Sequence, residues 1–143
     1  MSKLWNLLTG WWSPPQSAAS LGNSGESLAA QFLERNGFKI IERQLRGPYG
    51  ELDLVALDAD TVVFVEVKTR ATNAAGDPTE AITRAKQRKV TQSALAYLKR
   101  RHWLERRCRF DVVSILWQGS DGQPEIRHYP AAFDASGFGQ MYS

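Results

Sequence analysis

The sequence contains few of the residues that support disulfide or zinc chemistry. Among its 143 residues there is one cysteine, Cys108, and there are two histidines, His102 and His128. A single thiol cannot form an internal disulfide, and two isolated histidines lack the spacing of a structural zinc site. The composition therefore predicts a protein without disulfides from a reducing compartment, most simply the cytoplasm.

Apolar runs long enough to cross a bilayer are also missing. Residues 1–12 are largely apolar, but Asn6, Thr9 and Gly10 interrupt them and the stretch is too short for a membrane span. No small-residue cleavage site follows cleanly, so we expect neither a signal peptide nor a membrane partner. With 43% hydrophobic and 23% charged residues, the chain has the composition of a single globular domain.

The start of the chain differs from the remainder. Trp5, Leu8 and Trp12 fall at helical spacing, and two prolines follow them closely. This stripe could contact the domain, a second copy or a partner, or it could be a poorly ordered tail. We therefore predict an apolar, Trp-rich tail over residues 1–20 and one folded domain over residues 21–143.

Positive charge is concentrated in one stretch. From Arg84 to Arg109 there are ten Lys or Arg and one acid, so this stretch carries +9 in a chain of net charge +3. A basic segment beside an acidic remainder favours a nucleic-acid partner, with DNA as the first expectation. A solvated basic helix face is the alternative. The residues expected to contact phosphates without reading sequence are Arg84, Lys86, Arg88, Lys89, Arg100, Arg101, Arg106 and Arg107.

The order of the predicted elements indicates an α/β fold. Asn23 and Glu26 have the spacing of a capping box, and Asn36-Gly37 is typical of a helix end. A strand, a hairpin, a long helix and further strands follow, which predicts a sandwich with a mixed sheet. The expected ranges are a helix after residue 24, strands at 38–45, 51–57 and 61–68, a helix from Asp77-Pro78 to about Arg101, and strands at 109–117 and 125–129.

The predicted hairpin brings charged side chains together. If its turn is centred on residues 59–60, Asp53 lies opposite Glu66 and Glu51 lies opposite Lys68, all on one face. Two facing carboxylates repel unless one is protonated or a cation lies between them, and hard divalent ions such as Mg²⁺ take oxygen ligands of this kind. Cross-strand salt bridges on a wet sheet face are the alternative, and this is the reading we favour for Glu51.

Two lysines and one further acid have positions that need an explanation. Lys68 could orient an attacking water or stabilise negative charge on a phosphate. Lys86 falls within the apolar stripe of the long helix, so it either extends out to solvent or points over the carboxylates. Asp111 is expected to anchor neighbouring chain at the edge of the core, and Trp103 and Trp117 are expected to pack in the core rather than stack on bases.

Several segments together carry a family resemblance. Asp53, then twelve residues, then Glu66-Val67-Lys68 resembles the PD-(D/E)xK signature of restriction-endonuclease-like nucleases, with Leu52 in place of the proline. The ordered set is longer than this signature, and over residues 22–133 it resembles the YraN family of small, uncharacterised bacterial proteins. Its segments are Gly25-Glu26 at a helix start, Gly50-Glu51-Leu52-Asp53-Leu54-Val55, Phe64-Val65-Glu66-Val67-Lys68-Thr69-Arg70 and Arg109-Phe110-Asp111-Val112-Val113.

The resemblance implies a fold and an activity. The fold would be a restriction-endonuclease-like three-layer sandwich, a mixed central β-sheet flanked by helices, akin to archaeal Holliday-junction resolvases. The activity would be metal-dependent cleavage of phosphodiester bonds, with Mg²⁺ (or Mn²⁺) held by Asp53, Glu66 and Glu26 and with Lys68 assisting the attacking water. Glu26 could equally cap its own helix. By analogy with resolvases, two copies could form a homodimer.

The expected function is therefore a metal-dependent endonuclease acting on nucleic acid, first of all DNA, branched or linear. Two alternatives keep the same fold without turnover. One is a nucleic-acid-binding module whose affinity depends on salt but not on divalent ions. The other is an interaction protein that recruits partners through residues 1–20.

Overall fold

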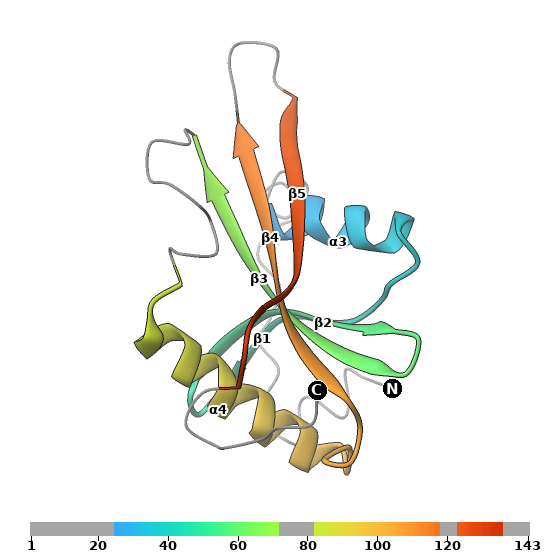
Figure 1. Cartoon of the computed structure of the whole chain (residues 1–143), viewed down its shortest axis with the longest axis vertical. Helices are drawn as coiled ribbons and strands as arrows, with labels where there is room; N and C mark the ends of the chain where they lie inside the picture. The colour runs from blue at the N-terminus through green and yellow to red at the C-terminus, as the bar shows by residue number, and fades with distance from the viewer. Residues whose placement is uncertain (1–24, 72–81, 118–122, 136–143) are drawn as a thin grey trace.

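The computed structural model describes residues 25–71, 82–117 and 123–135, which form a five-stranded mixed sheet and two helices (Figure 1). The strands follow one another in the sheet in chain order, and β3 and β4 are parallel whereas the other neighbours are antiparallel. The predicted α/β class with a mixed sheet is confirmed. The elements are α3 (Gly25–Arg35), β1 (Lys39–Gly47), β2 (Gly50–Asp58), β3 (Thr61–Arg70), α4 (Arg84–Arg100), β4 (Cys108–Trp117) and β5 (Pro124–Phe133).

The first described helix ends where the sequence predicts. Gly37 has a φ of 92°, a left-handed conformation that glycine adopts without steric cost, and the chain then turns into β1. Asn23, the expected cap, and the predicted tail over 1–20 lie outside the described residues. The tail and any contact that it makes with a second copy therefore stay predictions.

The long helix begins later than expected. Thr83 has extended backbone angles, and its hydroxyl accepts a hydrogen bond from the amide of Lys86 at 3.1 Å, so α4 starts at Arg84. The predicted start at Asp77-Pro78 is wrong for this helix, because Thr83 has taken the capping role. Asp77 and Pro78 themselves lie outside the described residues.

The predicted hairpin register is confirmed near the turn, but the predicted pairs of Asp53 with Glu66 and of Glu51 with Lys68 are not among the backbone pairs of these strands. β2 and β3 pair from Asp58↔Thr61 to Leu54↔Val65 around the two-residue turn at 59–60. A second hairpin joins β1 to β2 through Pro48 and Tyr49, and Gly50 after this turn has a φ of 125° that other residues rarely adopt. Both hairpins are set by turn residues that the sequence contains, which fixes which side chains face one another.

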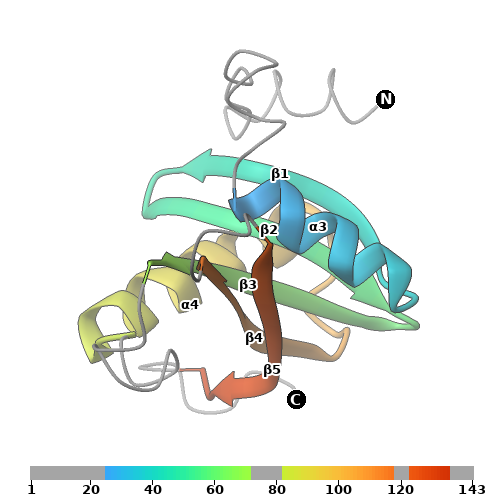
Figure 2. The ribbon, with the colours of Figure 1, turned by 90° about the horizontal axis from the view of Figure 1, so that it is seen from above.

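Each face of the sheet has its own hydrophobic core. The α4 core comprises Leu45, Leu52, Val55, Val62, Phe64, Val90, Ala94, Tyr97, Leu98, Cys108 and Phe110. The α3 core comprises Ala29, Ala30, Leu33, Leu54, Ala56, Val63, Val65, Val113 and Ile115. Figure 2 shows α3 lying close to β1 and β2, apart from α4. Trp103 packs against the α4 core and Trp117 against the α3 core, as expected.

One strand does not keep the regular alternation that the sequence suggested. Leu52 belongs to the α4 core and Leu54 to the α3 core, although residues two apart on a regular strand share a face. On the neighbouring strand, Gln44 has a positive φ of 48° between the pairs Arg43↔Leu54 and Leu45↔Leu52. The prediction of strict alternation through β2 is therefore wrong at Asp53, which lies opposite Gln44, where the backbone departs from extended geometry.

Asp111 anchors the edge of the sheet, as predicted. Its carboxylate is fully buried and accepts hydrogen bonds from the Arg109 guanidinium at 2.9 and 3.0 Å and from the Ala131 amide at 3.0 Å. Nε2 of His128 lies 2.7 Å from the same group. These contacts tie β5 to β4. In the part of the chain that is described, no helix has the length and apolar character needed to cross a membrane.

Candidate metal and phosphate site

Asp53 lies where the pairing between β2 and β3 ends. The last backbone pair is Leu54↔Val65, and Oδ2 of Asp53 accepts a hydrogen bond from the Val67 amide at 2.9 Å. The side chain thus takes the place of a backbone acceptor at the end of the ladder. Burial and the charge of Glu66 raise the pKa of Asp53 from 3.8 to about 8, although the Val67 hydrogen bond opposes this shift.

Glu66 is the most enclosed acid of the site. It is 7% exposed, and its charge acts on Asp53, the acid that the sequence placed opposite it. Burial raises the pKa of Glu66, whereas the positive charges of Lys86 and Lys68 and the hydrogen bonds oppose the rise. The ammonium of Lys86 is 3.7 Å from Oε2 of Glu66.

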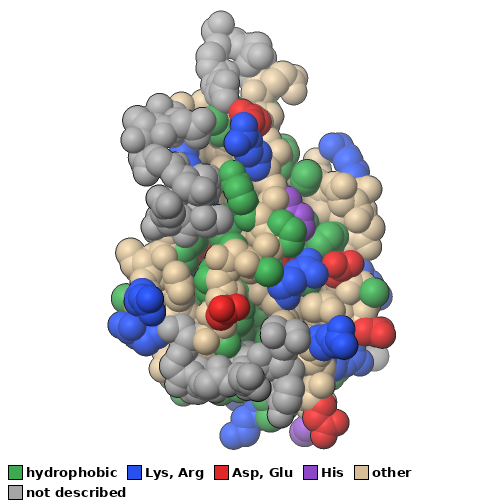
Figure 3. Space-filling model, in the orientation of Figure 1, with side chains coloured by type: hydrophobic (Ala, Val, Ile, Leu, Met, Phe, Trp, Pro, Cys, Tyr) green, Lys and Arg blue, Asp and Glu red, His purple; other side chains and the backbone are tan. Residues whose placement is uncertain are grey.

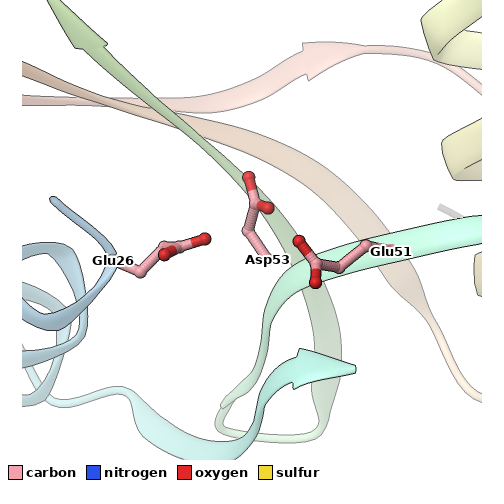
Figure 4. A group of neighbouring side chains, drawn as sticks. All are labelled: Glu26, Glu51 and Asp53. Carbon is pink, nitrogen blue, oxygen red and sulfur yellow. The ribbon is translucent and has the colours of Figure 1, made fainter. Parts of the chain in front are cut away.

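Two further acids approach Asp53 from the other side. Oxygen atoms of Glu26, Glu51 and Asp53 all lie within 4.8 Å of one another. Figure 4 shows Asp53 between Glu26, which extends from α3, and Glu51, which comes from β2. The amide of Gln44 donates a hydrogen bond to Oε1 of Glu26 at 2.8 Å, which holds this carboxylate in position.

Glu51 was not among the metal ligands expected from the sequence. Its predicted partner was Lys68 in a cross-strand salt bridge, but in the structure its carboxylate pairs with Nε of Arg46 at 3.5 Å while facing Asp53 and Glu26. The useful signal was its position two residues before Asp53. The approach of α3, which brings Glu26 to the same place, could not be read from the hairpin alone.

This arrangement suits a hard divalent cation. Carboxylate oxygens from α3 and β2 converge, and burial together with the charges of Glu66 and Glu26 raises the pKa of Asp53 to about 8, a cost that a bound cation would offset. Lys68 and Lys86 interact with Glu66 beside this group, which is a suitable position for binding a phosphate. The donor set thus fits the Mg²⁺ or Mn²⁺ that the sequence suggested.

The basic residues expected to contact nucleic acid are divided by the structure into two groups. Arg101 is 3.5 Å from the Glu42 carboxylate, is hydrogen-bonded to the Tyr97 hydroxyl and lies over the Trp103 ring, so it is held within the fold. Arg106 also lies over the Trp103 ring, while remaining exposed. On the face in Figure 3, basic side chains are interspersed with acidic and hydrophobic ones. Of the basic residues expected to contact phosphates, Arg84, Arg88, Lys89 and Arg100 are exposed on α4, and Arg107 is exposed after it.

The fold and the site together define an α/β protein with converging carboxylates and two lysines near the point where the pairing of β2 with β3 ends in a mixed sheet. The chain belongs to the family described as Uncharacterised protein family UPF0102, whose model matches residues 25–115. This range contains all the carboxylates and both lysines of the site. The resemblance to the YraN family, which is this family, is confirmed.

Bacterial relatives share this family over most of their length. A UPF0102 protein of Geobacter metallireducens is 48% identical over 115 residues, which cover 80% of this chain and 93% of the relative. One from Syntrophotalea carbinolica is 44% identical, covering 83% of this chain and 95% of the relative, and one from Rhodococcus opacus is 47% identical, covering 80% and 96%. The similarity thus extends over most of this chain and nearly the whole of each of these relatives.

Proposed function

We propose that this protein is a metal-dependent endonuclease of restriction-endonuclease-like fold, which hydrolyses phosphodiester bonds of DNA with Mg²⁺ or Mn²⁺. The observation that carries the proposal is the convergence of the Glu26, Glu51 and Asp53 carboxylates within 4.8 Å, next to the ion pair of Glu66 with Lys86 at 3.7 Å. A folded chain gains nothing from neighbouring acids that are partly or fully buried, because each raises the cost of ionising the others. Such a group is useful when a cation or a phosphate completes the site.

The residues have distinct roles in this proposal. Asp53, Glu66 and Glu26 would hold the cation, with Glu51 close enough to contribute a further oxygen. A divalent cation, when bound, supplies positive charge to a phosphate oxygen and lowers the pKa of water. Lys68 would hydrogen-bond the attacking water, and Lys86 would leave Glu66 to neutralise the charge that develops on the phosphate oxygens.

The proposal is tested by metal binding and cleavage measured on the same variants. Asp53→Asn and Glu66→Gln should abolish Mn²⁺ binding by calorimetry and cleavage of a labelled DNA junction, while the thermal unfolding transition survives. Lys68→Ala should abolish cleavage and leave DNA affinity within about twofold, because it removes no cation ligand. Glu34→Gln, an exposed acid on the same helix as Glu26, is the matched control and should behave as the parent. Cleavage at the parent rate by both Asp53→Asn and Glu66→Gln would contradict the assignment of these acids to an active site.

A nucleic-acid-binding module without turnover is the second candidate. The exposed cations on α4 favour it, because their contacts with phosphates would not require the carboxylates. In that case DNA affinity would fall with salt in the same way with Mg²⁺ and with EDTA, and no variant of Asp53 or Glu66 would change it. Cleavage of any DNA by the parent, lost in Asp53→Asn, would exclude this candidate.

A further inference from the structure

A groove separate from the carboxylates lies between the β1–β2 turn and α4. Its volume is about 700 Å³, and Pro48 and Tyr49 of the turn face Leu95, Lys99 and Arg100 of the helix across it. His102, just after the helix, completes this end of the groove. None of the carboxylates and lysines of the metal site contributes to its lining, so the groove requires its own explanation.

Tyr49 is the most unusual residue of this groove. It is 47% exposed, one of two large hydrophobic side chains that are exposed in the described part of the chain. It occupies a two-residue turn between two paired strands, which limits the conformations of its backbone. An aromatic ring held at the surface in this way loses little entropy when a flat ligand stacks on it.

The positive charge of the residues that line the groove favours an anionic ligand. Among the groove residues Lys99 and Arg100 are basic, both are exposed, and none is acidic. A ring flanked by cations is the arrangement by which proteins bind unpaired nucleotides, with the base on the ring and the phosphates on the cations. An acidic partner protein would satisfy the cations but would leave Tyr49 without a matching planar group.

We propose that this groove binds an unpaired nucleotide segment of DNA, with a base stacked on Tyr49 and the adjoining phosphate near Lys99. This inference rests on the proposed function in one respect, since it names the substrate class of the carboxylate site as DNA with an unpaired segment close to the bond that is cut. Binding in the groove itself requires no cation and no cleavage.

Two rigid elements connect the groove to the carboxylates. Along β2, Asp53 lies four residues after Tyr49, about 13 Å at the rise of a strand. Along α4, Lys86 lies ten residues before Ala96, about 15 Å at the rise of a helix. These lengths agree, and they correspond to about four stacked nucleotides. An unpaired base in the groove would therefore place a phosphate of the same strand at the carboxylates.

The test measures DNA binding by the full chain in EDTA, so that neither the cation nor cleavage contributes. Fluorescence anisotropy is recorded with a duplex that has a single-stranded overhang and with a blunt duplex of the same length. Tyr49→Ala should weaken binding of the overhang DNA about 5- to 100-fold, as expected for loss of one stacked base, and change blunt-duplex binding less than twofold. Tyr49→Phe should retain binding, because the ring remains.

Two further variants distinguish binding in the groove from a general effect of charge and from a loss of folding. Lys99→Gln should weaken overhang binding and reduce its salt dependence, whereas Leu104→Ala, which shortens an exposed apolar side chain outside the groove, should have no effect. Equal affinities of Tyr49→Ala and the parent for overhang DNA would overturn the inference, and would favour a protein ligand. If Tyr49→Ala and the parent bind overhang DNA equally but Asp53→Asn loses cleavage, the groove inference fails while the proposed nuclease function stands.

Discussion

Lys86 on α4 forms an ion pair with Glu66 on β3, with Nζ 3.7 Å from Oε2. The side chain of Glu66 is 8% exposed and that of Lys86 is 41% exposed, so the lysine reaches from solvent to a nearly buried acid. Of the two orientations considered for Lys86, this is the one over the carboxylates. Its contact with a substrate phosphate stays a prediction.

Replacing Lys86 should change both the pKa of Glu66 and the rate of DNA cleavage. In Lys86→Ala the pKa of Glu66 should rise further, because the positive charge that opposes the effect of burial is lost. Cleavage should fall about 100-fold, which is typical for the loss of one group that stabilises developing charge. Carbon-13 NMR titration of the glutamate carboxyl groups measures the first effect. Lys89→Ala, exposed on the same helix, should change neither, and an unchanged Glu66 titration in Lys86→Ala would contradict the assigned ion pair.

Asp53→Asn should stabilise the protein in the absence of divalent cations. The folded pKa of Asp53 is about 8 and its ordinary value is 3.8, so the folded state binds this proton more tightly than the unfolded state. Ionising Asp53 therefore lowers the free energy of unfolding, and this loss is absent below pH 4, grows from pH 4 to 8 and then remains constant. Asparagine keeps an oxygen for the Val67 amide without this penalty, so the free energy of unfolding should rise by about 1–4 kcal/mol at pH 7.

Urea unfolding between pH 4 and pH 8, in EDTA and in Mg²⁺, measures this effect. Mg²⁺ should stabilise the parent and not the variant, because binding to the folded state alone adds to stability. Glu34→Gln is the control at an exposed position and should follow the parent at every pH. A variant that is less stable than the parent at pH 7 would mean that Asp53 has a structural role.

The hairpin could be predicted because its information is local. The turn at 59–60 sets the register, and this register, which is paired as far as Leu54↔Val65, brings Asp53 next to Glu66. Gly37 likewise ends α3 through its own backbone freedom. The motif segments predicted the family, and the match to the UPF0102 family and its bacterial members confirms it.

The features that the sequence did not predict depend on contacts between distant elements. The acidic cluster at Asp53 is completed by Glu26, which comes from α3, an element distant from the hairpin. The alternation of β2 changes between Leu52 and Leu54, opposite the positive φ of Gln44 on β1, and the hairpin sequence alone contains no signal for this change. The start of α4 was missed for a different reason, since Asp77-Pro78 and Thr83 are both acceptable helix starts and the local pattern does not choose between them.

Gly25 should be needed for the position of Glu26. A Cβ atom at Gly25 would clash with Oγ1 of Thr69, so Gly25→Ala must shift either the start of α3 or the threonine. Because a β-branched side chain has few rotamers, we expect the helix to move and Mn²⁺ affinity to fall about tenfold. Calorimetry measures the affinity, and the double variant Gly25→Ala/Thr69→Ala should restore it.

Gly37→Ala provides the control for Gly25. It strains the other end of α3, where φ is 92°, and should lower stability by about 1 kcal/mol without changing metal affinity. An unchanged affinity in Gly25→Ala would mean that Thr69 rotates away and that Gly25 does not position Glu26.

Asp111 should show the opposite pH dependence to Asp53. Burial alone would raise the pKa of Asp111, but hydrogen bonds from His128, Arg109 and the Ala131 amide outweigh it and lower the pKa below 3.8. The stabilisation is therefore present above pH 4 and is lost as the pH falls. Asp111→Asn should lower the free energy of unfolding by about 2–3 kcal/mol at pH 7, because it removes the charge that accepts two hydrogen bonds from the Arg109 guanidinium.

Urea unfolding from pH 7 down to pH 3 tests this expectation against an exposed pair on the neighbouring strand. Glu125→Gln breaks the ion pair of Glu125 with Arg127, and its unfolding midpoint should match that of the parent because both partners are solvated. The deficit of Asp111→Asn should shrink as the pH falls below 4, whereas the gain of Asp53→Asn should disappear at the same end of the range. A deficit that does not vary with pH would show that Asp111 stabilises the fold through its shape and not its charge. The pH dependence of stability at Asp111 would then not be opposite to that at Asp53.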